Sequence, residues 1–140
     1  MSRRQRPIRL VRRMNSPVHK VTTDEWQVAR RALESLISKS EKAQQKLAAG
    51  TWQHKMLGDN LKALRIASAL MDRNVAETDR LATNDLRDAR RALDSMAGKA
   101  SKARASFAPG TSHHTLQQNR LKALRIAQAL TQAHLAERET

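Results

Sequence analysis

The sequence repeats itself at a fixed offset of sixty residues. The segment LKALRIA occupies residues 61–67 and returns unchanged at residues 121–127. About 25 of the 60 positions in residues 21–80 are identical in residues 81–140, with no insertion. A constant period of this size indicates a duplicated structural unit. Because sixty residues are close to the lower limit for independent folding, we expect the two copies to share one hydrophobic core.

Each copy has the pattern of two helices joined by a tight turn. In the first copy Thr22 and Glu25 have the spacing of a capping box, and apolar residues follow at helical period. Gly50 suits the position just after a helix, and Thr51 can cap the next helix. Two helices joined by so short a turn lie side by side and antiparallel. The low aromatic content, 2%, also favours helices over strands.

We therefore predict an all-α protein, in which two tandem antiparallel hairpins form a four-helix bundle. This requires the chain to fold back between Met71 and Thr83, where it has neither Pro nor Gly. The alternative is one long helix that pairs with a second chain. The second helix of the first copy is apolar over most of its circumference, so it must be buried on several sides. We expect a homo-oligomer for this reason, and we expect the tail from residue 132 to fray.

Apolar residues that are identical in both copies are expected to form the shared core. Positions that differ, such as Met71 and Thr131, are expected to face solvent in one copy. The retained apolar residues of the first copy are Leu61, Ala63, Leu64, Ile66, Ala67 and Leu70.

Positive charge is concentrated at the N-terminus. The formal net charge is +14, and half of it, +7, lies in residues 1–20, where there is no acidic residue. We expect this segment to be a disordered arm that binds nucleic acid, an anionic membrane or an acidic partner. A mitochondrial presequence is a further alternative, but Pro7 and Pro17 argue against it. The predicted nucleic-acid-binding arginines of the arm are Arg3, Arg4, Arg6, Arg9, Arg12 and Arg13.

A basic stripe is predicted on the back of the first helix of each copy. Its members recur at spacings of three, four and seven, which places them along one helix face. Such stripes follow phosphate backbones, although ordinary solvated helices have them too. The residues are Arg31, Lys39, Lys42 and Lys46 in the first copy, and Arg91, Lys99 and Lys102 in the second.

The polar wedge of the second helix is a candidate anion or nucleotide site. Its basic residues are retained in both copies, and they could contact an extended anion or two small ones. The alternatives are helix capping by the histidines and simple solubilisation by the other residues. The candidates are His54, Lys62 and Arg65, with His114, Lys122 and Arg125 as their equivalents.

No arrangement of residues suggests an enzyme, a metal site or a cofactor, because HExxH, Walker and triad patterns are missing and cysteine is absent. No apolar run is long enough to span a bilayer, and we expect a cytoplasmic protein. The sequence favours a non-enzymatic nucleic-acid-binding protein that contacts mainly phosphates, with low sequence specificity. Two alternatives stay open: a small-anion binding protein that sequesters a nucleotide, and a regulator or assembly component that contacts only protein.

Overall fold

The computed structural model describes residues 21–139, which form five helices and no strand. The protein is therefore all-α over this range. Predictions about the arm, including its disorder and its six arginines, lie outside the described residues. The long helices are α2 (Thr23–Gln45), α3 (Trp52–Met71), α5 (Thr83–Ala105) and α6 (Ser112–Glu139), and α4 (Val75–Asp79) is a single short turn.

The helix starts follow the predicted capping chemistry in three of four long helices. Thr22 and Glu25 form the capping box of α2: the Glu25 N–H donates to Thr22 Oγ1 at 3.1 Å, and the Thr22 N–H donates to Glu25 Oε1 at 3.0 Å. The Thr51 and Thr111 hydroxyl oxygens each accept the N–H three residues later, at 3.2 Å. Helix α5 differs, because its N-cap is Ala82, which has no side-chain acceptor.

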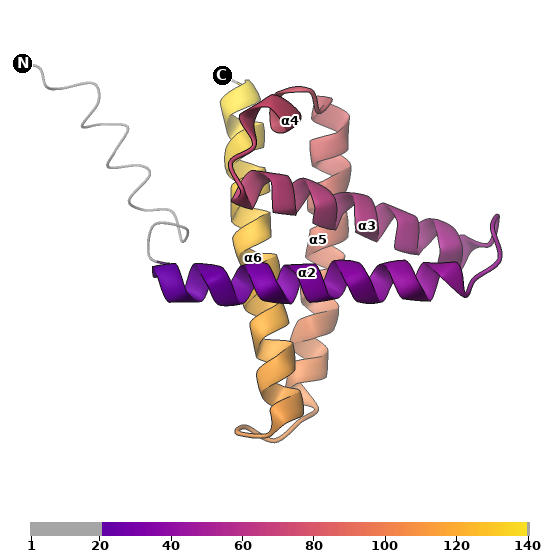
Figure 1. Ribbon diagram of the computed structural model, residues 1–140, viewed down its shortest axis with the longest axis vertical. Helices are drawn as coiled ribbons and strands as arrows, with labels where there is room; N and C mark the ends of the chain where they lie inside the picture. The colour runs from indigo at the N-terminus through magenta and orange to yellow at the C-terminus, as the bar shows by residue number, and fades with distance from the viewer. Residues whose placement is uncertain (1–20, 140) are drawn as a thin grey trace, which may run out of the picture.

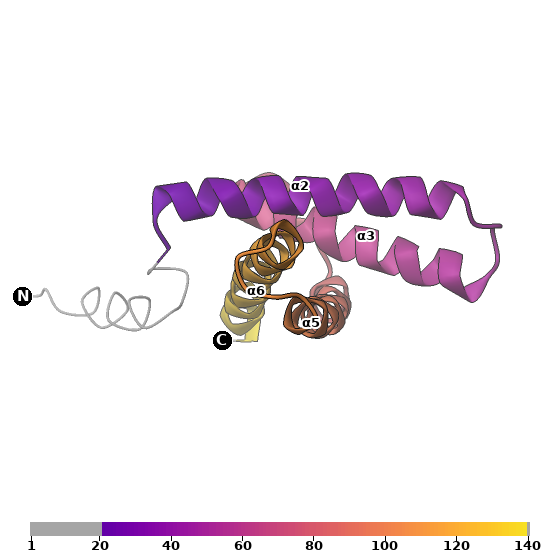
Figure 2. The same ribbon diagram turned by 90° about the horizontal axis from the view of Figure 1, so that it is seen from below.

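The helices form two pairs that cross each other in two layers. Helices α2 and α3 lie side by side after the turn at Gly50, which has a φ of +92°, and α5 and α6 do so after Gly110, with a φ of +89° (Figures 1 and 2). The second pair runs across the first, whereas a four-helix bundle in the strict sense would align all four axes. We call α2–α3 the first helix pair and α5–α6 the second.

The chain reverses direction directly after α3, so the alternative of one continuous helix is wrong. Arg73 has a φ of +56°, in the left-handed region. Its N–H donates to the Leu70 carbonyl at 3.2 Å, and the Asn74 N–H donates to the Ala69 carbonyl at 3.0 Å. This is a Schellman motif, which normally places glycine at the left-handed position. Asn74 then caps α4, because its Oδ1 accepts the Glu77 N–H.

The core lies between the two pairs and draws on both copies. Helix α3 packs on α5, α6 packs on α2, and α3 meets α6 at the centre. Leu64 and Leu124, sixty residues apart, are 0% and 2% exposed. The retained residues predicted to form the core are buried or packed against it.

Two expectations about exposure were wrong. Met71 and Thr131 are both buried, at 3% and 0% exposure, and the Thr131 hydroxyl is satisfied by donating to the Ala127 carbonyl at 2.7 Å. The tail is helical through residue 139 and is held by buried Leu135. Arg138 also donates to the backbone carbonyls of Thr78, in α4, and of Leu81, in the connection between α4 and α5.

Candidate anion-binding groove

Lys62 and Lys122 make reciprocal ion pairs between the two helix pairs. Lys62 Nζ on α3 lies 2.8 Å from Asp85 Oδ1 on α5, and Lys122 Nζ on α6 lies 2.5 Å from Glu25 Oε2 on α2. Both lysines and both acids are related by the sixty-residue offset. The retention of these lysines is therefore explained by contacts between the pairs.

The reciprocal ion pairs shift the pKa values of their members. The hydrogen bond from Lys122, followed by those from Thr22, lowers the pKa of Glu25 to about 2. The hydrogen bond to Asp85 raises the pKa of Lys62, and the same contact lowers the pKa of Asp85. The shifts show that the contacts favour the charged form of each side chain at neutral pH. All four side chains border solvent, so the pairs position the helices more than they stabilise them.

The three residues predicted as one anion site in the first copy are not brought together. Arg65 lies 2.5 Å from Glu41 on α2, whereas Lys62 contacts α5. His54 takes part in the α3 start through its backbone: its N–H is capped by Thr51, and its carbonyl accepts from Gln44 Nε2 at 3.2 Å.

The equivalent residues of the second copy are arranged differently. Lys122 and Arg125 both line a groove on the second helix pair, which is described below, whereas His114 is half-buried and does not line it. Only part of the predicted anion set therefore shares one surface.

Both predicted basic stripes are exposed and lie on separate surfaces. Arg31, Lys39, Lys42 and Lys46 are exposed on or directly after α2, and within residues 21–139 they make no ion pair. In the second copy Lys99 and Lys102 are likewise exposed and unpaired in the described part of the chain, and Arg91 pairs with Asp88 at 3.1 Å. Helices α2 and α5 do not pack together.

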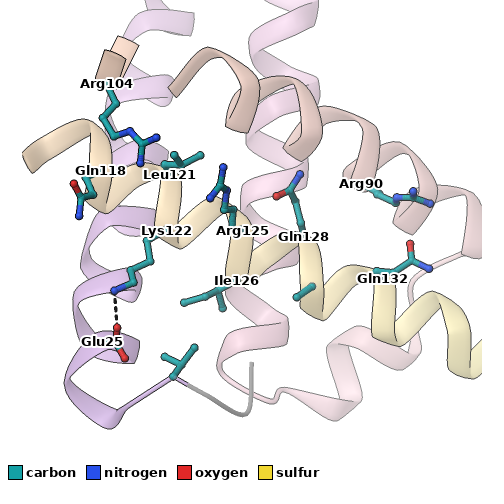
Figure 3. Close-up of a pocket in the computed structure, with 12 residues that line it drawn as sticks. Glu25, Arg90, Arg104, Gln118, Leu121, Lys122, Arg125, Ile126, Gln128 and Gln132 are labelled. Carbon is teal, nitrogen blue, oxygen red and sulfur yellow. Dashed lines mark hydrogen bonds and ion pairs between the residues drawn. The ribbon is translucent and has the colours of Figure 1, made fainter. Parts of the chain in front are cut away.

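A groove on the second helix pair gathers basic residues that the sequence prediction had only partly named. Its volume is about 790 Å³, and α5, α6 and the start of α2 contribute its walls. Arg104 and Arg90 reach it from α5 and Arg125 from α6, with Arg125 between the other two (Figure 3). We call this the arginine groove. It is lined by Val21, Glu25, Arg90, Arg104, Gln118, Leu121, Lys122, Arg125, Ile126, Gln128, Ala129 and Gln132.

The three arginines of the groove have no partner. Across the described range, the side chains of Arg90, Arg104 and Arg125 make neither an ion pair nor a hydrogen bond. Glu25, the acid in the groove lining, pairs with Lys122. Asp94 and Glu139 lie with Arg90 around a neighbouring pocket and make no ion pair with it; Asp94 accepts Gln128 Nε2 at 2.7 Å, and Glu139 lies 3.6 Å from Arg87.

Comparison of the two copies gives the reason that these arginines are unpaired. In the first copy, the equivalents of Arg90 and Arg125 are neutralised. Arg30 lies 2.6 Å from Asp72, and Arg65 lies 2.5 Å from Glu41. In the second copy, Gln132 stands in place of Asp72, and Ser101 stands in place of Glu41. Arg104 is an additional charge, since the first copy has Gln44 there. The groove therefore acquires positive charge by the loss of two acids and the gain of one arginine.

Arg90 and Arg104 were not among the predicted site residues. Arg104 has no basic counterpart, because the first copy has Gln44 at that position, whereas Arg90 is retained as Arg30 and differs from it only in lacking an acidic partner. The sequence signal that could have found both is a difference between the copies: an arginine gained at residue 104, and an acid, Asp72, that is absent sixty residues later.

The groove has the chemistry to bind phosphate groups. Guanidinium groups stay charged at all physiological pH values, and their planar donors match phosphate oxygens in pairs. Gln118 and Gln132 add amide donors and acceptors, while Leu121 and Ile126 give an apolar floor. Among residues 21–139, no cluster of three or more His, Asp or Glu side chains could hold a metal ion.

No helix within the described range is both long enough and apolar enough to cross a membrane. No family model matches the chain, and neither a curated protein nor a solved structure was found to match it. We therefore infer function from the chemistry of its own side chains.

Proposed function

We propose that this protein is a non-enzymatic nucleic-acid-binding protein that contacts mainly phosphates and has low sequence specificity. One observation carries the proposal: three arginines that have no ion pair within residues 21–139 line one groove. Unpaired guanidinium groups in a hollow are arranged for an anion with several phosphates, since each can bind one phosphate through two donors.

The charge distribution supports a polymeric ligand. The chain has a net charge of +14, and residues 1–20 carry half of it. Val21, the residue that follows this basic segment, lines the arginine groove. The exposed stripes on α2 and α5 add further positive charge on other faces. Charge spread over this much surface exceeds what one small anion can use, and it favours a long polyanion.

The proposal is tested by measuring the affinity for a fluorescent RNA or DNA as a function of salt. Binding through several phosphates gives a steep linear fall of log K with log salt concentration. Deletion of residues 1–20 is expected to weaken binding and to reduce this slope. The proposal is wrong if the folded full-length protein binds no nucleic acid at low salt, or if its affinity is the same at low and high salt.

A second candidate is a small-anion binding protein that sequesters a nucleotide. The groove volume of about 790 Å³ favours it, because small-molecule sites have volumes of roughly 300–1,000 Å³. Free nucleotides would then raise the melting temperature, since a ligand that binds only the folded state stabilises it. Deletion of residues 1–20 would leave that shift intact, which separates this candidate from the first.

A regulator that contacts only protein has less support. The apolar surface of α3 that suggested a further chain is covered by α2, α5 and α6. Exposed large apolar side chains remain, with Trp52 at 69% the most exposed of those described. A homo-oligomer and a cytoplasmic location stay predictions, which light scattering and fractionation can test.

We also infer that the two helix pairs are duplicated hairpins that share one four-helix core. The uninterrupted sixty-residue offset supports this inference. The reciprocal Lys62–Asp85 and Lys122–Glu25 contacts support it too. In each contact the lysine belongs to one copy and the acid to the other, at positions related by the sixty-residue offset.

A further inference from the structure

We propose that the arginine groove binds an unpaired stretch of a nucleic-acid strand, and that the protein therefore prefers single strands to duplexes. This rests on the proposed function and adds the form of the nucleic acid, the site and the residues. Arg90, Arg104 and Arg125 contact phosphates spaced along the same strand, and the apolar lining receives bases.

The spacing of the arginines fits a strand better than a single nucleotide. Arg90 and Arg104 are fourteen residues apart on α5, which places their backbone positions roughly 21 Å apart along the helix axis. Arg125 of α6 lies between them in the groove (Figure 3). A mononucleotide cannot reach both ends of such a row, whereas a strand of about four nucleotides, the lower end of common single-strand site sizes, can follow it.

The floor of the groove suits bases that are not paired. Half-buried Val21 and Ala129 offer apolar contact to a base face above Leu121 and Ile126, which are only 2% and 6% exposed. Gln118 and Gln132 offer an amide donor and acceptor to a base edge. A duplex hides its base faces in the stack, so it could use only the arginines. No aromatic side chain lines the groove, and base selectivity is therefore expected to be modest.

Charge disfavours the N-terminal segment of the chain as the ligand of the groove. Residues 1–20 carry a charge of +7, and the groove is also positive, so a polyanion suits the groove better.

The first copy supplies the substitutions for the test. Ser101→Glu together with Gln132→Asp introduces into the second copy the two acids that neutralise Arg65 and Arg30 in the first. All arginines remain, so a loss of binding beyond that of Gln132→Ala, which removes only the Gln132 amide, reports neutralisation of the groove by the added acids. The control, Ser35→Glu with Gln53→Glu, adds the same charge at exposed positions of the first helix pair.

Binding is measured by fluorescence anisotropy with a twelve-nucleotide probe, as single-stranded RNA, single-stranded DNA and the matching duplex. The full-length protein is expected to bind the single strands more tightly than the duplex. The groove variant is expected to bind single strands about tenfold more weakly, because the added acids compete with phosphates for charge-assisted hydrogen bonds from the arginines. Its salt slope is expected to fall by about 1.4, because two fewer phosphates are neutralised on a single strand.

A second variant tests the same groove independently, so that the inference can still be judged if the first variant does not fold. Arg104→Gln with Arg125→Gln places in the groove the residue type that the first copy has at position 44. Its matched control is Arg30→Gln with Arg65→Gln, which removes the same charge from arginines that are already paired. Circular dichroism confirms that each variant is folded before its affinity is compared.

The outcomes separate this inference from the proposed function. If the protein binds nucleic acid but both groove variants bind as their controls do, the groove assignment is wrong and the general function survives. If the duplex competes as well as the single strand, the preference is wrong. If a mononucleotide binds as tightly as the probe, the site belongs to a small anion. If no probe binds the folded protein, the proposed function itself fails.

Discussion

Arg73 is the residue whose substitution most sharply tests the chain reversal that creates the two crossed pairs. Its φ of +56° lies in the left-handed region, and among residues 21–139 it is the one residue other than glycine with a positive φ. The side chain is exposed and makes no ion pair within the described range. Arg73→Gly therefore changes little apart from the backbone preference at this position. We expect the variant to be more stable than the wild type.

The magnitude follows from two opposing backbone effects. A residue with a Cβ pays about 1–2 kcal/mol in the left-handed conformation, and glycine avoids this cost. Glycine loses about 0.5–1 kcal/mol more chain entropy on folding than alanine does. The net gain expected for Arg73→Gly is about 0.5–1 kcal/mol. For a chain of this size, that corresponds to a rise of about 2–4 °C in melting temperature.

Urea unfolding followed by circular dichroism measures the effect, with two matched controls. Arg73→Ala keeps the Cβ and is expected to change stability by less than about 0.5 kcal/mol. Ala133 occupies the equivalent position sixty residues later, inside α6, so Ala133→Gly is expected to cost about 1 kcal/mol. If Arg73→Gly destabilises the protein as Ala133→Gly does, residue 73 is helical and the reversal after α3 is refuted.

Three further predictions address the caps, the core and the contacts between the pairs. Ala82→Thr supplies the N-cap acceptor that α5 lacks and is expected to add about 1 kcal/mol of stability in thermal unfolding; an unchanged melting temperature would contradict the assigned helix start. Leu64→Ala is expected to cost about 3–5 kcal/mol in urea unfolding, against less than about 1 kcal/mol for Leu116→Ala, which is 41% exposed in the wild type; similar costs would refute the core. The Glu25 carboxylate, with its pKa lowered from 4.5 to about 2, contributes stability above pH 4.5 that is lost as the pH falls toward 2. Glu25→Gln is therefore expected to flatten the pH dependence of stability across that window, and a curve that stays parallel to the wild type would exclude the contact with Lys122.

Much of the secondary structure could be predicted from the sequence because local chemistry determines it. The capping box at Thr22, the glycine turns at Gly50 and Gly110 and the helical period of the apolar residues each depend on neighbours along the chain. The reversal at Arg73 was harder to predict, because an arginine occupies the place of the usual glycine. The crossing of the two pairs depends on packing between segments sixty residues apart, which periodicity alone does not specify.

The candidate site was predicted only in part, because identity between the copies arises from contacts within the fold as readily as from ligand binding. Lys62 and Lys122 are retained since each contacts an acid on the other helix pair. Arg125 is also retained, but it has no ion pair because Ser101 stands where the first copy has Glu41, the partner of Arg65. Such dependence on a partner across the fold becomes visible only when the helices are placed in space.

Photocrosslinking of a 4-thiouridine-substituted single-stranded RNA, with the attachment sites located by mass spectrometry, tests the central claim most directly. The account predicts that crosslinks concentrate on residues 118–132 of α6 and on residues 90–104 of α5. It also predicts that Ser101→Glu with Gln132→Asp reduces them about tenfold at protein concentrations below the dissociation constant. Crosslinks confined to the stripe on α2, unchanged by those two substitutions, would contradict it.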